Sequence, residues 1–366
     1  MDLDLPYLTA SLPGIGGALR ATPDDFVVDE LPAYEPCGEG EHTLARIEKR
    51  GLNTQDAVER IARALGVDPR DAGYAGLKDR HARTTQWISL PRVDPARALS
   101  LELDGVRVLE AGRHRNKLKT GHLRGNRFTL RVSGVCDLDA ALRHALAIET
   151  ELRFHGCPNY YGEQRFGRDG ANAARGVRWL RGEVPAPRDR FQRRLQVSAV
   201  QSTLFNQVLA ARVTRGELSR WVEGDLAMRH AQGRPWAITR EEAEALYPAF
   251  EASASGPMFG PKMPRASGEE GRREDEVLSG ASVTLEDLAR AGDLAEGTRR
   301  IVRVRPEGME IDRDGDAIRF AFTLPAGAYA TVVMREFLKS DAGDGLKPDL
   351  AGGIQPTPQP RHEADS

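Results

Sequence analysis

Strand-like and helix-like segments alternate along this chain, and that alternation limits the architectures open to it. In 317–324 the apolar residues Ile318, Phe320 and Phe322 recur at every second position, which predicts a strand with one buried face. Residues 53–66 instead carry apolar side chains at helical spacing, with a capping Asn53 or Thr54 at the start and a glycine at the end. Many connections between such segments read as hairpins. The sequence therefore predicts an α+β fold with a mixed or antiparallel sheet flanked by helices.

The same reasoning predicts the other elements of the fold. Further strands are expected at 25–31, 43–49, 85–90, 128–132, 300–305 and 310–313, and further helices at 137–154 and 198–213.

The chain has 366 residues, which is more than one hydrophobic core usually accommodates. Residues 156–303 are richer in glycine, proline and irregular charge than the segments on either side. We therefore expect 156–303 to form a domain inserted between two pieces, 1–155 and 304–340, of a first domain. Residues 341–366 contain few core-forming side chains and are expected to be a disordered tail.

Composition predicts a cytoplasmic protein. No apolar run approaches the roughly 20 residues that cross a bilayer, and the N-terminus lacks the basic-then-apolar pattern of a signal peptide. Cys37, Cys136 and Cys157 stand far apart without a C-x-x-C pair, which argues against disulfides and against a structural zinc site. Residues 14–19 are rich in glycine but lack the spacing and the preceding strand of a dinucleotide-binding loop. No metal or cofactor is expected.

Net charge is −2, so the overall balance gives no indication of a nucleic-acid partner, but the charges are segregated. Residues 107–131 contain eight basic side chains against one acidic, and residues 165–194 contain nine arginines against three acids. Acidic residues gather elsewhere, as at 269–276. Phosphate binding would explain this segregation, and a solvated charged surface explains either segment equally well.

Residues 73–86 combine two glycines with a single carboxylate, Asp79, between Lys78 and Arg80. Glycines allow a close approach of the backbone, and neighbouring cations favour the ionised form of a carboxylate. Such a carboxylate can act as a nucleophile if the site excludes water. On local grounds alone, a capping or salt-bridging aspartate is the favoured explanation of this residue.

Two further segments could recognise a nucleobase. Asn126 offers a donor and an acceptor that match the edge of a uracil, and Phe128 lies on the same side of the expected strand. Residues 158–167 interleave Tyr160, Tyr161 and Phe166 with polar side chains, a pattern suited to stacking on bases and bonding to phosphates. A turn asparagine before a core phenylalanine, and a turn at a domain interface, are the structural alternatives.

Six stretches together resemble the TruD family of tRNA pseudouridine synthases and occur in family order across about 20–340. They are A-T-P-D-D-F-V-V-D-E at 21–30, A-G-L-K-D-R-H-A-x-T-x-Q around Asp79, G-N-x-F at 125–128, N-Y-Y-G-E-Q-R-F-G at 159–167, S-x-L-F-N-Q at 202–207 and L-P-A-G-A-Y-A-T at 324–331.

The resemblance implies a pseudouridine synthase catalytic domain with an inserted α/β TRUD domain. It implies that Asp79 is the nucleophile and that Phe26, Asn126 and Tyr329 line the pocket for the target base. Tyr329 stands where a bacterial relative carries phenylalanine, so the ring is kept and a hydroxyl is added. Arg20 stands where lysine is usual, and a pairing role with Asp79 is expected of it. The implied substrate is uridine 13 of certain tRNAs, with no cofactor, metal, membrane or protein partner.

Three alternatives stay open at this point. The chain could be a non-catalytic RNA-binding or chaperone protein that has kept the fold, which the intact Asp79 argues against. It could also be a carboxylate-dependent nucleoside hydrolase, for which no second suitably spaced acid emerges. Its substrates could also extend to other tRNA uridines or to messenger RNA. Whether Asp79 attacks the sugar C1′ or C6 of the uracil is left undecided by the sequence.

Overall fold

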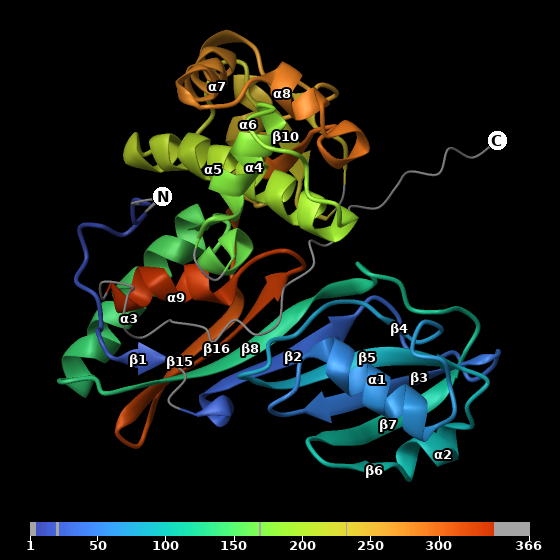
Figure 1. Cartoon of the computed structure of the whole chain (residues 1–366). Coiled ribbons are helices and arrows are strands. Elements are labelled where there is room, and N and C mark those ends of the chain that lie inside the picture. Colours follow the sequence, from blue (N-terminus) through green and yellow to red (C-terminus); the bar gives the residue numbers. More distant parts are fainter. Residues whose placement is uncertain (1–4, 20–21, 168–169, 232, 340–366) are drawn as a thin grey trace. The chain divides into compact units, whose positions relative to one another are not determined.

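The computed structural model describes residues 5–19, 22–167, 170–231 and 233–339, which form two compact units (Figure 1). The first, called here the helical unit, contains the described parts of Met1–Gly14, Arg143–Pro306 and Ala328–Lys339. The second, called the sheet unit, contains the described parts of Ile15–Leu142 and Glu307–Gly327. The expected inserted domain, 156–303, falls within the helical unit.

The sheet unit is built on ten strands. Eight run in the order β15-β16-β8-β2-β5-β3-β7-β6, β1 pairs with β8, and β4 pairs with β5. Among the strands described, only β2 and β5 pair in parallel. The strands are β1 (Ala18–Leu19), β2 (Phe26–Pro32), β3 (His42–Lys49), β4 (Gly73–Tyr74), β5 (Arg83–Pro91), β6 (Glu102–Leu103), β7 (Val106–His114), β8 (Leu123–Ser133), β15 (Glu307–Asp314) and β16 (Ala317–Pro325).

One face of this sheet, called here the inner face, is packed along several strands. Cross-strand register places Phe128 of β8 between Val28 of β2 and Phe322 of β16, and all three side chains are buried. Further along the sheet α1 (Thr54–Ala64) covers β3, β5 and β7, where its buried Val58 and Ile61 share one core cluster with those strands. Figure 1 shows α1 lying across these strands. The inner face therefore carries the core of the sheet unit. The unit also contains α2 (Pro95–Leu99) and the short helix η1 (Pro23–Asp25).

The helical unit surrounds α5 (Arg190–Thr214), most of whose C-terminal two-thirds is buried. The unit has a four-stranded antiparallel sheet in the order β11-β10-β12-β13 and a small pair, β14 with β9. Its strands are β9 (Cys157–Pro158), β10 (Leu226–Arg229), β11 (Trp236–Ala237), β12 (Ala252–Met258), β13 (Thr298–Ile301) and β14 (Arg303–Val304). Its helices are η2 (Glu163–Phe166), α4 (Asn172–Leu180), α6 (Arg240–Leu246), α7 (Gly268–Gly280), α8 (Leu285–Ala289), η3 (Gly292–Leu294) and α9 (Ala330–Leu338), and α3 (Leu138–His155) enters it at Arg143.

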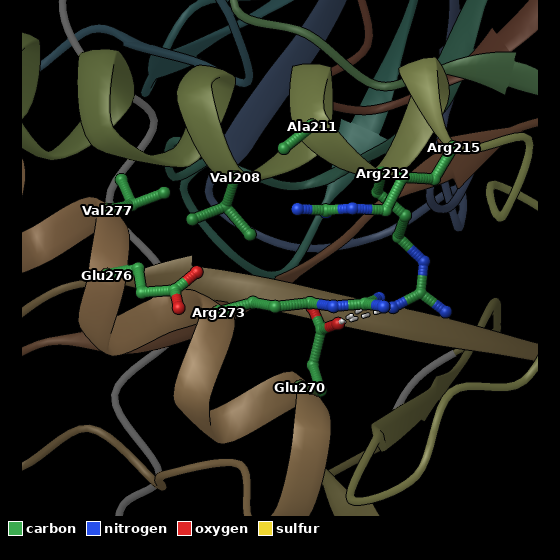
Figure 2. A pocket seen from close by; sticks show the side chains of 8 residues that line it. All are labelled: Val208, Ala211, Arg212, Arg215, Glu270, Arg273, Glu276 and Val277. Carbon is green, nitrogen blue, oxygen red and sulfur yellow. Dashed lines mark ion pairs between the residues drawn. The ribbon is translucent and has the colours of Figure 1, made fainter.

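A small pocket between α5 and α7 is occupied by its own ion pairs (Figure 2). Arg212 pairs with Asp225 at 2.7 Å and with Glu270 at 3.3 Å, and Arg273 bonds to Glu217 at 2.7 Å. Because Arg212 is buried among these carboxylates, its guanidinium is already neutralised. The ion pairs in this pocket therefore join α5 to α7, and the pocket is not a candidate catalytic site.

The predicted α+β class with a mixed sheet is confirmed. The strand expected at 43–49 and the helix capped by Asn53 agree closely with β3 and α1, and the Asn53 side chain accepts from Asp56 N at 2.8 Å. The strand expected at 128–132 is longer, because β8 begins at Leu123. The single strand expected at 300–305 is two, β13 and β14, which pair with different partners.

The expectation of a disordered tail at 341–366 falls outside the described residues. Within the described ranges, no helix combines the length and the apolarity that crossing a membrane requires. In the same ranges, no group of three or more His, Cys, Asp or Glu side chains is arranged to hold a metal ion.

Candidate active site

Polar side chains interrupt the apolar inner face of the sheet unit near its centre. On β2, Glu30 follows Phe26 and Val28 in the buried alternation, and on β8 its cross-strand partner is Asn126. On β3, Lys49 continues the inward phase and is fully buried. Burial of such groups costs free energy unless they are paired, so this part of the sheet is built for more than packing.

The candidate site lies beside β5, at the gap between the segment of β5 that pairs with β2 and the segment that pairs with β4. β2 pairs with β5 at 83–85, whereas β4 pairs with it at 88–89, so the ladder is interrupted between them. Glu30 fills the interruption: its Oε1 accepts from Trp87 N at 3.1 Å, and its Oε2 accepts from Lys78 Nζ at 2.6 Å. Lys78 and Glu30 are both buried, and Lys78 is the residue immediately before Asp79.

The loop 75–82 that carries Asp79 is fixed through its backbone. Lys78 N donates to Thr54 Oγ1 at 2.8 Å, and Gln86 Nε2 donates to Gly76 O at 3.3 Å. Thr54 and Gln86 are also bonded to each other at 2.9 Å. Because the start of α1, β5 and the loop share these bonds, the loop is held against the sheet.

Lys49 holds the same loop from the end of β3. Its Nζ donates to Asp79 O and to Leu52 O, each at 2.7 Å. Burial lowers the pKa of Lys49 to about 8, although the negative charge of Asp79 acts in the opposite direction. Asp79 itself is half-buried. The nucleophile proposed from the sequence therefore belongs to a loop whose backbone is held by hydrogen bonds from Thr54, Gln86 and Lys49. Lys49 is a buried cation bonded to the carbonyl of Asp79 itself.

The structure brings Phe26, Asn126 and Phe128 together on the inner face. The rings of Phe26 and Phe128 meet edge to face with centroids 6.4 Å apart, and Phe128 also contacts Phe322 at 5.7 Å. Phe128 is therefore a core residue of the sheet unit, whether or not it also contacts a base. Asn126 Oδ1 is buried, and no described residue donates a hydrogen bond to it. A buried acceptor without a hydrogen bond costs free energy in a native structure.

Tyr329 belongs to the helical unit, where it stands at the N-cap of α9. Its ring meets that of Tyr161 edge to face at 6.1 Å, and the guanidinium of Arg300 lies 4.1 Å from the Tyr161 centroid. Burial raises the pKa of the Tyr329 hydroxyl, against the opposing effect of Arg165 and Arg300. The segments 159–167 and 324–331, which resemble the family separately, thus meet at Tyr161 and Tyr329. Arg20 lies outside the described residues.

The two basic segments differ in how far neighbouring acids neutralise them. Within 107–131, four arginines are ion-paired with acids from other segments: Arg113 with Asp94, Arg115 with Glu39, Arg127 with Glu310, and Arg131 with Asp314 and Asp316. Within 165–194, the exposed Arg178, Arg188 and Arg194 form no ion pair with the described residues. Arg181 and Arg190 of this segment are paired, with Glu183 and Asp293. The described arginines of the second segment are therefore less completely paired with acids than those of the first.

Sequence reasoning missed Lys49, Glu30, Thr54 and Gln86, the side chains that hold the Asp79 loop. A signal for two of them was present. Lys49 continues the phase of Ala45 and Ile47, and Glu30 that of Phe26 and Val28, so each is a charged residue at a position that its strand reserves for the core. The partners of Thr54 and Gln86 carry no such signal, because they depend on tertiary register.

Comparison with known proteins identifies the family of the chain. The family model described as tRNA pseudouridine synthase D (TruD) matches residues 2–184 and 189–337. A protein of Anaeromyxobacter dehalogenans strain 2CP-1, named tRNA pseudouridine synthase D, is 50% identical over 347 residues, covering 93% of this chain and 97% of that protein. A Thermus thermophilus protein of the same name is 40% identical over 352 residues, covering 94% of this chain and 95% of that protein.

The fold agrees as well. A crystal structure of a Methanosarcina mazei protein, described as a tRNA pseudouridine synthase D, superposes with a TM-score of 0.75 at 26% identity, covering 92% of this chain and 96% of that one. The chain therefore belongs to the TruD family.

Proposed function

We propose that this protein isomerises a uridine of tRNA, uridine 13, to pseudouridine, with Asp79 as the nucleophile. The observation that carries the proposal is the neighbourhood of Asp79 in the sheet unit. A clamped loop carries this carboxylate, and Glu30 links the loop through Lys78 to the strand position opposite Asn126. The buried Oδ1 of Asn126 accepts no hydrogen bond from a described residue. An imide N–H such as that of uracil would satisfy that acceptor. The choice of tRNA rests on the names of the relatives, and that of uridine 13 on the family resemblance.

The target base must leave the folded RNA before a carboxylate can reach it, which costs a few kcal/mol. Stacking on an aromatic ring returns about 1–3 kcal/mol per base, enough to offset most of that cost. Phe26 is the ring of the sheet unit that we assign to this task, and Phe128 supports it from the side.

In the proposed reaction the Asp79 carboxylate attacks the flipped nucleoside, at C1′ or at C6. The bond between C1′ and N1 breaks, the uracil turns while it stays bound, and a bond forms between C1′ and C5. The hydrogen on C5 is lost as a proton, N1 gains a proton, and Asp79 is released. Substrate and product are isomers, so the sequence of steps requires no oxidant and no added group.

The test is Asp79→Asn, which keeps the size of the side chain and removes its charge. We expect unchanged tRNA affinity and a loss of turnover of more than about a thousandfold, because an amide is a poor nucleophile. Pseudouridine is measured at each position of tRNA incubated with the purified protein. Asp71→Asn, which alters an exposed aspartate outside the clamped loop, serves as the matched control.

Turnover by Asp79→Asn within tenfold of wild type would remove Asp79 from the role of nucleophile. Modification by the wild-type protein at uridines other than 13, or in messenger RNA at comparable rates, would overturn the proposed substrate choice. If the wild-type protein binds tRNA without forming pseudouridine, it is an RNA-binding protein that has kept the fold.

A further inference from the structure

Lys49 is a buried cation whose hydrogen-bond acceptors are backbone carbonyls. Both of its bonds, to Leu52 O and Asp79 O, measure 2.7 Å, and no carboxylate among the described residues lies within ion-pair distance of it. By contrast, the neighbouring buried Lys78 is neutralised directly by Glu30. A lysine buried in this way lowers stability relative to an apolar side chain. Packing of the sheet alone therefore gives no reason for a cation at this position.

We infer that Lys49 is a positioning residue for the reaction: its ammonium fixes the peptide plane of Asp79 and thereby the direction of the Asp79 carboxylate. The inference rests on the proposed function. The carbonyl that Lys49 binds belongs to Asp79 itself, so a shift of that carbonyl moves the Cα from which the side chain projects. Misplacement of a reacting group by about 1 Å can cost on the order of 100-fold in rate.

The charge of Lys49 contributes as well as its donors. A charge-assisted hydrogen bond is roughly twice as strong as a neutral one, and the ammonium attracts the Asp79 carboxylate through space. The charged groups that act on Lys49 are Asp79 and Lys78, and Glu30 compensates Lys78. Loss of the Lys49 proton, with its pKa of about 8, therefore weakens the restraint on Asp79 in a pH range where enzymes are easily assayed.

A purely structural role is the alternative, because the bond to Leu52 O also closes the turn between β3 and α1. Thr43 provides a matched control for that role. It lies on β3 in the same inward phase as Lys49, it is fully buried, and its Oγ1 donates to Val93 O at 2.5 Å. Thr43→Val removes a buried hydrogen bond that a side chain of β3 donates to a backbone carbonyl, and it leaves every bond to the Asp79 loop in place.

The experiment compares kcat and KM for tRNA in wild type, Lys49→Met, Lys49→Gln and Thr43→Val between about pH 6.5 and 9.5. We expect Lys49→Met to lower kcat by on the order of 10- to 100-fold, with KM changed less than about twofold. Lys49→Gln, which keeps a donor but loses the charge, should fall in between. Thr43→Val should lower the melting temperature and leave kcat unchanged.

The pH profile separates positioning from folding. In wild type kcat should fall as the pH rises through about 8, and this decrease should be absent from both Lys49 variants. An unchanged kcat in Lys49→Met, or a wild-type decrease that persists in Lys49→Gln, would overturn the inference. If Lys49→Met does not fold, the inference is tested by the kcat of Lys49→Gln and by the pH profiles of Lys49→Gln and wild type. Absence of pseudouridine from the wild-type reaction would instead reject the proposed function.

Discussion

At the scale of single residues, the candidate site is a set of polar side chains at positions that the strands reserve for apolar ones. Glu30, Lys49 and Asn126 each continue the inward phase of a different strand. Glu30 and Lys49 each bond to the loop of Asp79 and to one further backbone group, whereas the acceptor of Asn126 is not satisfied by any described residue. The cost of burying these groups falls on the stability of the sheet unit, and each cost has a measurable consequence.

Replacement of Asn126 tests recognition of the base. Asn126→Leu removes both the donor and the acceptor at similar size, so the imide of a bound uracil would lose its partner. A buried polar group left unpaired costs about 1–3 kcal/mol, which corresponds to a 5- to 150-fold loss of kcat/KM. Steady-state kinetics with tRNA measure it. Because Asn126 Oδ1 has no partner among the described residues, the melting temperature should stay level or rise, and a large decrease would assign Asn126 to the fold instead.

Lys49 also predicts a pH-dependent difference in stability. Its pKa of about 8 in the folded protein lies below the ordinary value of 10.5, so the unfolded chain binds the proton more tightly. The free energy of unfolding of wild type should therefore rise, relative to Lys49→Met, as the pH increases from about 8 to 10.5, by on the order of 3 kcal/mol. Urea unfolding of both proteins at pH 7 and pH 10 measures this difference. A difference that does not depend on pH would mean that Lys49 is not buried as a cation.

At the scale of elements, close contacts between neighbouring strands constrain the site as much as side chains do. Gly125 precedes Asn126 on β8 and lies opposite Pro325 of β16. A Cβ at residue 125 would lie 2.2 Å from the carbonyl oxygen of Leu324, a backbone atom that cannot turn away. The glycine before Asn126 therefore serves the pairing of β8 with β16, and through it the placement of Asn126.

Gly125→Ala should separate these two strands locally and lower stability by about 1–3 kcal/mol, the usual range of overpacked substitutions. Pseudouridine formation per folded molecule should fall as well, because Asn126 is the next residue. Gly280→Ala, where the added methyl meets nothing within 4 Å, is the control. Equal melting temperatures for the two variants would contradict the role given to Gly125.

The elements that sequence predicted well are those whose signals are local. The apolar spacing and Asn53 cap of α1, and the alternation of β3 and β16, appear in the structure nearly as expected. What could not be predicted depends on register: the interrupted ladder around β5, which assigns Glu30 to Trp87 and Lys78, has no trace in the segments themselves. For the site, Asp79 was proposed as the nucleophile from family resemblance. The strand phase marks Glu30 and Lys49 as unusual, but their partners required the structure.

At the scale of the whole molecule, charge is the property that most directly concerns a polyanionic partner. Several arginines of 107–131 pair with acids from elsewhere in the chain, whereas Arg178, Arg188 and Arg194 keep their charge free of ion pairs with described residues. From the sequence alone, the same two explanations applied to both basic segments. We expect the second segment to contribute more to binding of a tRNA backbone.

The affinity for tRNA should fall steeply with salt, and the arginines of 165–194 should account for more of the slope than those of 107–131. In a plot of log affinity against log salt, Arg178→Gln with Arg194→Gln should reduce the slope by about 1–2. Arg113→Gln with Arg115→Gln should change it less, because these arginines already have carboxylate partners. A flat salt response of the wild-type protein would make both segments ordinary solvated surface.

The pairing of β8 with β16 has a consequence for synthesis of the protein in the cell. β8 ends at Ser133 and β16 begins at Ala317, so a ribosome must polymerise the whole intervening stretch before the partner strand emerges. At about 5–20 residues per second this takes on the order of 10–40 s. Throughout that interval the nascent sheet ends at β8. Its unpaired backbone groups and the apolar side chains of Phe128 and Leu130 can then bind chaperones or other nascent chains. Truncation before residue 317 should therefore leave aggregates rather than a smaller active enzyme.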